Sequence, residues 1–267
     1  MKYFQLLFFF IAVICFSQNY ELKYHYIYNY DSVNSSNINK EDVYVIKQND
    51  MRLYLSNNVL ETNRIQYYGN KNNENHQEIW KKLNNVPLSK ISSIIYQKEN
   101  KTTINKKLGT IIYETKIDCP QINWKFSNEK HHSNLELKKA TTIYLGRKWI
   151  AWYNESIVIN DGPFLFNNLP GLIVELYDDE NYFNWTLLEY NLETKEDYIK
   201  LIEDRTLKVF DISNNEFNTI IKKDFYNPIT AIEGSGIKVP EDRKKRIVEY
   251  LKNVKYRFIL KDTMLYL

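Results

Sequence analysis

A strict alternation of aromatic and polar residues near the N-terminus constrains the fold most. Tyr or Leu occupies every even position from Tyr20 to Tyr30, whereas Glu21, Lys23 and His25 stand at odd positions between them. Side chains on a β-strand point alternately to opposite faces of the sheet, so the pattern predicts a strand with one buried, Tyr-rich face. Tyrosine favours half-buried sheet surfaces of this kind.

Further short strands are expected along most of the chain. They cover residues 43–47, 51–55, 91–97, 101–104, 110–117, 123–126, 135–145, 149–153, 172–177 and 183–190, and Gln48-Asn49-Asp50 is expected to close a hairpin. The connections are short, which favours antiparallel pairing of sequential strands. We therefore predict a mainly β (α+β) protein: a twisted antiparallel meander, partly closed into a half-barrel.

The C-terminal part changes to helical spacing. Ser213 and Glu216 form a capping box, and apolar residues then recur at Phe217, Ile221 and Phe225. Pro240 begins a second helix. Two C-terminal helices from about residue 213 are expected to pack on the open side or end of the sheet.

The first 17 residues are typical of an export signal. Lys2 precedes an apolar run from Tyr3 to Phe16, which is shorter than the ~20 residues that span a bilayer. Small residues at Cys15 and Ser17 favour cleavage before Gln18, and lipidation at Cys15 is the alternative. We expect a signal peptide over residues 1–17, one domain over residues 18–267, and a periplasmic or secreted protein.

Charge and cysteine content narrow the function further. The net charge of +3 falls to +2 once Lys2 is removed, because residues 1–17 contain no acidic residue. Such a balance argues against nucleic acid as a partner. Cys119 is then the one remaining cysteine and has no intramolecular partner.

The segment from Gly146 to Asp178 is rich in turn-forming residues. Leu169-Pro170-Gly171-Leu172 fits a type II turn, with Gly171 accepting a positive φ. Leu172, Val174 and Leu176 then alternate with Ile173, Glu175 and Tyr177, which predicts a strand with one buried face.

These residues resemble the signature of the GLPGLI family, exported envelope proteins without an established activity. Agreement covers roughly residues 124–190, at Trp124, Lys139-Ala140-Thr141, Gly146-Arg147, Ala151-Trp152-Tyr153, Gly162-Pro163, Leu169-Pro170-Gly171-Leu172-Ile173 and Asp178. The sequence departs from the family pattern at Leu137, Val158 and Asn168. Asparagine tolerates the left-handed conformation, so the turn is expected to survive at Asn168. The resemblance implies no catalytic set; at the level of fold, the pattern is also similar to the open half-barrels of periplasmic lipoprotein carriers.

Candidate chemical groups have plainer explanations. His131-His132 could bind a metal only in a turn, and two exposed loop histidines is the simpler interpretation. Cys119, which precedes Pro120, lacks a motif that would orient a base, and Asp178-Asp179-Glu180 fits an acidic hairpin tip better than a cation site. With 7 glycines in 267 residues and no nucleotide-binding motif, no cofactor, metal or catalytic residue is predicted.

Aromatic side chains near the two turns leave two interpretations open. The set is Arg147, Trp149, Trp152, Tyr153, Phe164 and Trp185, with Phe166 beside it. It either fills a core or forms an apolar wall that binds a ligand, with Arg147 at the rim beside an anionic group. We expect Trp152 to be packed, and Trp149 and Tyr153 to lie nearer the surface.

Two hypotheses on function follow. The first is a non-enzymatic binding or accessory protein of the cell envelope, which holds an apolar small molecule or docks an envelope partner. The second is an enzyme with an unrecognised carboxylate and histidine site near the Pro170-Gly171 turn. Convergent carboxylates and a histidine in a cleft would favour the enzyme, and an aromatic groove would favour the binding protein.

Overall fold

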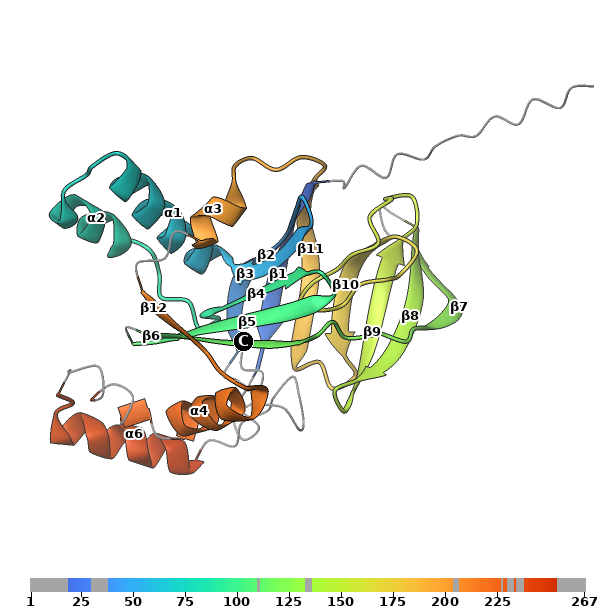
Figure 1. Cartoon of the computed structure of the whole chain (residues 1–267). Helices are drawn as coiled ribbons and strands as arrows, with labels where there is room; N and C mark the ends of the chain where they lie inside the picture. Colours follow the sequence, from blue (N-terminus) through green and yellow to red (C-terminus); the bar gives the residue numbers. More distant parts are fainter. Residues whose placement is uncertain are drawn as a thin grey trace, which may run out of the picture.

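The structure is a computed structural model of the whole chain (Figure 1). It describes residues 19–29, 38–109, 111–132, 136–203, 207–226, 228, 229, 233 and 238–253. The predicted signal peptide over residues 1–17, with Cys15, and most of the polar segment after Tyr30 lie outside the described residues. No helix in the described part of the chain has both the length and the apolar character needed to cross a membrane.

Twelve strands of the described residues form one twisted, open sheet. They are β1 (Tyr20–Tyr28), β2 (Asn39–Gln48), β3 (Met51–Ser56), β4 (Ser93–Lys98), β5 (Lys101–Leu108), β6 (Ile111–Asp118), β7 (Lys125–His132), β8 (Glu136–Tyr144), β9 (Arg147–Asn154), β10 (Leu172–Asp178), β11 (Phe183–Asn191) and β12 (Lys208–Asp211). Their order in the sheet is β12-β6-β5-β4-β3-β2-β1-β11-β10-β9-β8-β7. The mainly β prediction is confirmed.

The sheet consists of two antiparallel meanders joined side by side. Strands β1 to β6 form one and β7 to β11 the other, and the first strand of one pairs with the last strand of the other. The chain therefore places its Tyr-rich strand β1 at the centre of the sheet. Strand β12 was not predicted, and it pairs with β6 in the parallel direction.

The described part of the chain contains five helices with defined bounds. They are α1 (Asn57–Lys71), α2 (His76–Leu83), α3 (Tyr198–Glu203), α4 (Asn214–Tyr226) and α6 (Glu241–Asn253). The two C-terminal helices are confirmed, and so is the capping box: the Ser213 hydroxyl accepts the Glu216 amide hydrogen, while the Glu216 carboxylate accepts the Ser213 amide hydrogen. The sequence analysis missed α1, α2 and α3.

Helices cover opposite sides of the sheet (Figure 1). α1 and α3 pack against β2 and, for α1, β3, whereas α4 lies on the other side against β6. The side under α1 and α3 has its own apolar cluster, with Ile46, Leu53 and Leu55 from the sheet and Leu60 and Leu201 from the helices.

The opposite side of the sheet, hereafter the inner face, carries the larger core. It includes Tyr24, Tyr54, Ile104, Trp149 and Trp185, so one continuous apolar layer extends over both meanders. The even-numbered residues of β1 from Leu22 to Tyr28 are all buried, as the alternation predicted.

Candidate functional site

The loop between β9 and β10, residues 155–171, lies on the inner face and is called here the motif loop. It contains no helix or strand. Its side chains Phe164 and Phe166 are fully buried against the aromatic residues of the sheet. Phe166 lies 4.8 Å from Trp149 between ring centroids, and Phe164 lies 5.7 Å from Tyr54 and parallel to Trp185 at 6.5 Å. The motif loop thus fills part of an aromatic surface that the sheet itself builds.

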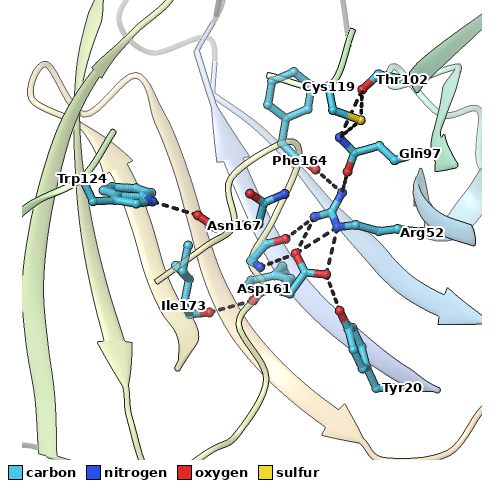
Figure 2. A network of polar contacts seen from close by, with 12 residues as sticks. Tyr20, Arg52, Gln97, Thr102, Cys119, Trp124, Asp161, Phe164, Asn167 and Ile173 are labelled. Carbon is cyan, nitrogen blue, oxygen red and sulfur yellow. Dashed lines mark hydrogen bonds and ion pairs between the residues drawn. The ribbon is translucent and has the colours of Figure 1, made fainter. Parts of the chain in front are cut away.

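A buried ion pair holds the motif loop at its centre (Figure 2). Arg52 of β3 donates from Nε to both carboxylate oxygens of Asp161, at 2.9 and 2.8 Å. The same guanidinium donates to the carbonyl oxygens of Gly162 and Phe164, each at 2.7 Å. An arginine side chain can make these contacts at the same time, because its planar guanidinium has five N–H donors in a fixed geometry.

Three further hydrogen bonds attach the loop and the start of β10 to distant strands. The Tyr20 hydroxyl donates to Asp161 at 2.6 Å, and the Tyr24 hydroxyl donates to the Ile173 carbonyl at 2.6 Å. Trp124 Nε1 donates to the Asn167 carbonyl at 2.8 Å. The loop is therefore fixed by residues from β1, β3 and the segment before β7.

Burial and charge shift the pKa values of these groups in the expected directions. Burial alone would lower the pKa of Arg52, but the adjacent Asp161 outweighs it and the pKa is raised. Burial, reinforced by the negative charge of Asp161, raises the pKa of Tyr20 far above its ordinary value. Arg52 therefore stays charged and Tyr20 stays a proton donor throughout the physiological range.

The Arg52 cluster continues to the free cysteine. Arg52 donates to the Gln97 amide oxygen at 3.2 Å, and the Gln97 amide nitrogen donates to Thr102 Oγ1 at 3.1 Å. The Cys119 sulfur lies 3.5 Å from Thr102 Oγ1 and is half-buried. Among the described residues no histidine makes a hydrogen bond with this sulfur, so its contacts are those of a packed thiol.

The Pro170-Gly171 turn differs from the predicted type. Gly171 does have a positive φ, at 147°, but its amide donates to the Leu169 carbonyl at 2.8 Å and so closes a three-residue turn around Pro170. The glycine is required sterically, because a Cβ here would lie 2.1 Å from the Asn154 carbonyl oxygen. Asn168 has a φ of 66°, so the left-handed conformation expected at this departure from the family pattern is confirmed.

Strand β10 does not alternate as strictly as predicted. Leu172 and Leu176 are fully buried, but so is Ile173, whereas Val174 is half-buried. The register between β9 and β10 shifts between Ile173 and Glu175, and a β-bulge of this kind moves the side chains that follow to the other face.

The predicted division of the aromatic set is wrong. Trp149 and Tyr153 are 0% and 3% exposed, whereas Trp152 is half-buried on the opposite face. There Lys139 lies 5.7 Å above the Trp152 ring, and the His131 ring is 5.8 Å away. The reason is the pairing of β9 with its neighbours, which turns its odd positions to the inner face. Trp185 and Phe164 are also fully buried. A ligand role for this set remains a prediction, and it would require the motif loop to move.

Arg147 is not at a rim. It is 6% exposed and donates to Asp178 at 2.9 Å, and Asp178 also accepts the amide hydrogens of Tyr182 and Phe183. Asp178 is therefore a buried turn residue, and only Asp179 and Glu180 form an exposed tip. Burial raises the pKa of Asp178, although Arg147 opposes the shift.

Histidines do not form the predicted loop pair. His131 lies in strand β7 and is exposed, and the side chain of His132 is outside the described part. No group of three or more His, Cys, Asp or Glu residues in the described part of the chain is arranged to hold a metal ion.

The sequence analysis missed Arg52, Asp161 and Tyr20. Arg52 had a usable signal, because a single charged residue in the apolar strand Met51–Ser56 must be paired if it is buried. Asp161 directly precedes Gly162-Pro163, but nothing in the sequence connects it with a residue 109 positions earlier.

Residues 44–175 match the model of a family described as "Protein of unknown function (Porph_ging)". The matched segment includes Arg52, Asp161 and Gly171. The chain matches no curated protein.

Solved structures show likeness of fold. Two crystal structures of PNGF-II, in different space groups, match with a TM-score of 0.50 and 15% identity, over 77% of this chain and 33% of theirs. The chain therefore spans about a third of PNGF-II. A LolA superfamily protein from Nitrosomonas europaea matches with a TM-score of 0.30 and 8% identity, over 68% of this chain and 90% of its own. A likeness this low supports no conclusion.

Proposed function

We propose that this chain is an exported GLPGLI-family protein of the cell envelope that binds an apolar ligand on the inner face and catalyses no reaction. The observation that supports the proposal is the position of Phe164 and Phe166. These side chains, from a loop without regular structure, lie against Trp149, Trp185 and Tyr54 of the sheet. They indicate the chemistry that the inner face accepts: apolar groups.

In this proposal the motif loop is an internal occupant of the ligand site. Moving it exposes the two phenylalanines, so the ligand must bury a comparable apolar area on the sheet. The loop could leave the inner-face core without breaking strand pairing, because it is connected to the rest of the chain by the side-chain hydrogen bonds of Arg52, Tyr20 and Trp124 and by a backbone hydrogen bond from Ile173 to Asp161.

Export and family are supported by the sequence. The apolar N-terminal segment after Lys2 is typical of a signal peptide, and the Pro170-Gly171 motif resembles the GLPGLI signature. The Porph_ging match over residues 44–175 includes this motif and is consistent with the assignment.

No observation favours the enzyme hypothesis. The carboxylate beside the turn is Asp161, and its oxygens are already engaged by Arg52, Tyr20 and the Gly162 amide. Among the described residues, no histidine forms a hydrogen bond or ion pair with this carboxylate.

Two measurements test the proposal. Native mass spectrometry of the protein purified from its own envelope should show a co-purified apolar molecule. Hydrogen exchange with that molecule, or with decanol as a probe, should show faster exchange at the amides of Phe166, Asn168 and Gly171, which are hydrogen-bonded in the ligand-free loop.

The amides of α1, on the opposite side of the sheet, are the internal control and should not change. An apo mass after native purification, together with unchanged exchange in the motif loop on addition of decanol, would refute the proposed function.

A further inference from the structure

Another buried cation, Lys106, lies on the inner face, on the other side of Arg52 from the motif loop. Lys106 of β5 is 8% exposed, and within the described part of the chain its ammonium group makes no hydrogen bond or ion pair. Its position in the strand is even-numbered, like that of the buried Ile104, so its side chain points to the inner face. A buried ammonium group without a direct partner is costly, and such a group marks a site that lacks an acceptor.

A second donor without an acceptor lies beside it. Thr115 of β6 is fully buried, and its hydroxyl oxygen has no hydrogen-bond partner. In the β5–β6 pair Lys106 is opposite Tyr113 and Ile104 is opposite Thr115, so Lys106 and Thr115 are diagonal neighbours on one face. In an antiparallel pair this separation is about 7–8 Å, which one small group can bridge with two hydrogen bonds.

Helix α4 brings a carboxylate to the same region without pairing it. Phe217, Ile221 and Asp224 share one helical stripe, and the first two are buried in the inner-face core. Asp224 is close enough to influence Lys106, yet no ion pair joins them. Burial lowers the pKa of Lys106 to about 8, while Asp224 acts in the opposite direction. At neutral pH most of the lysine is therefore charged.

We propose that Lys106 and Thr115 bind the carboxylate group of a ligand whose apolar body lies on the inner face. The Lys106 ammonium can only donate and the Thr115 hydroxyl can also donate, so a ligand group that serves both is an acceptor, and an anion best matches an ammonium. The flanking side chains Ile104, Leu108 and Ile221 are apolar, which favours a carboxylate on a hydrocarbon body over a free small anion. This inference rests on the proposed function and names the chemical class of its ligand.

The test compares two probes of equal chain length, decanoate and decanol, on the full mature chain by isothermal titration at pH 7. Decanoate should bind the parent protein, and Lys106→Met should weaken it about tenfold or more, as expected for loss of a charged hydrogen bond. Thr115→Val should weaken decanoate less, and both variants should bind decanol as the parent does.

Lys107→Met is the matched control, because Lys107 is the next residue of β5 and is exposed on the opposite face. It should bind decanoate like the parent. Thermal melting of each variant checks folding, and Lys106→Met should melt no lower than the parent.

The outcomes separate the two claims. Equal decanoate affinity of the parent and a folded Lys106→Met variant would overturn this site and leave the binding function intact. Binding of neither decanoate nor decanol by the parent would overturn the proposed function, and this inference with it.

Discussion

Two of the buried cations on the inner face, Arg52 and Lys106, differ sharply in their surroundings. Arg52 has a carboxylate, a glutamine and two backbone carbonyls around its guanidinium, all within 3.2 Å. Arg52 pairs through Gln97 of β4 with Thr102 of β5, and Lys106 lies four residues further along β5. In the described part of the chain, its ammonium group has no hydrogen-bond or ion-pair partner. Both are more than nine-tenths buried. Burial alone therefore does not distinguish a structural charge from one that lacks a partner. The distinction depends on how many of its N–H donors have an acceptor.

The difference has an energetic meaning. Arg52 is compensated, so it adds specificity: only one placement of the motif loop presents Asp161, Gly162 and Phe164 to it together. Lys106 is uncompensated and destabilises the ligand-free fold. Functional sites commonly carry such a cost, because a group kept ready for a ligand is not satisfied without it.

Removal of the compensated cation should have the largest effect. Arg52→Met leaves Asp161 buried with its charge unpaired, and we expect a loss of about 3–5 kcal/mol in the free energy of unfolding, measured by urea denaturation. The double variant Arg52→Met/Asp161→Asn should recover part of that loss, because it removes the orphaned charge.

Arg64→Met is the matched control for Arg52→Met. Arg64 pairs with Glu61 and Glu196 nearer the surface, where screening reduces the value of an ion pair, so the loss should stay within about 1 kcal/mol. Similar losses for Arg52→Met and Arg64→Met would contradict the argument that the buried ion pair of Arg52 fixes the motif loop.

Truncation of the two tryptophans of β9 should show which face is the core. Trp149→Ala opens a cavity among Phe166, Phe183 and Trp185, so we expect about 3–5 kcal/mol of destabilisation by denaturation. Trp152→Ala removes a half-buried ring on the other face and should cost clearly less. A greater loss for Trp152→Ala would mean that β9 is placed in the wrong register.

The sequence predicted the sheet well for a physical reason. Most strands have local sequence signals, such as the even-numbered Tyr residues of β1 and the short Asn49-Asp50 connection between β2 and β3. Helix α1 was missed because its apolar residues are few: only Leu60 and Gly69 are buried, and the helix begins directly after β3, with Ser56 as its cap. Its stability comes from tertiary contacts with β2 and β3.

The site was less predictable because it is made of long-range contacts. The signature Gly162-Pro163 and Pro170-Gly171 marked the motif loop correctly, but Arg52 and Tyr20 reach it from far away in the sequence. The face on which Trp149 and Trp152 lie depends on strand register, which one residue of shift reverses. Lys106 looked like one of many surface lysines, since nothing local distinguishes it from Lys107.

A substitution in the turn that ends the motif loop should cost less stability than removal of the Arg52 ion pair. Gly171→Val places a β-branched residue at a φ of 147° and its Cβ against the backbone of Asn154, so we expect a loss of about 1–3 kcal/mol and a lower melting temperature. Val158→Ala, at an exposed position of the same loop, should be nearly neutral. A Gly171→Val protein that melts with the parent would contradict the steric role of this glycine.

Lys106→Met should give the smallest effect, and one of opposite sign. Methionine keeps most of the apolar stem and removes the unpaired ammonium, so we expect a gain of about 1–2 kcal/mol in the free energy of unfolding at pH 7.

The gain should depend on pH. Burial lowers the pKa of Lys106 from 10.5 in the unfolded chain to about 8 in the fold, while Asp224 of α4 acts in the opposite direction. Tyr113 of β6 and Ser93 of β4 are the strand neighbours of Lys106. Between these two values the unfolded chain holds more protons, so the parent gains stability as the pH rises. The advantage of Lys106→Met should therefore be complete below about pH 8 and should decrease as the pH rises from 8 towards 10.5, in chemical denaturation measured across that range, while Lys107→Met shows no such dependence. A variant less stable than the parent at pH 7 would mean that the Lys106 ammonium has a stabilising partner in the fold, which would contradict the contrast drawn with Arg52.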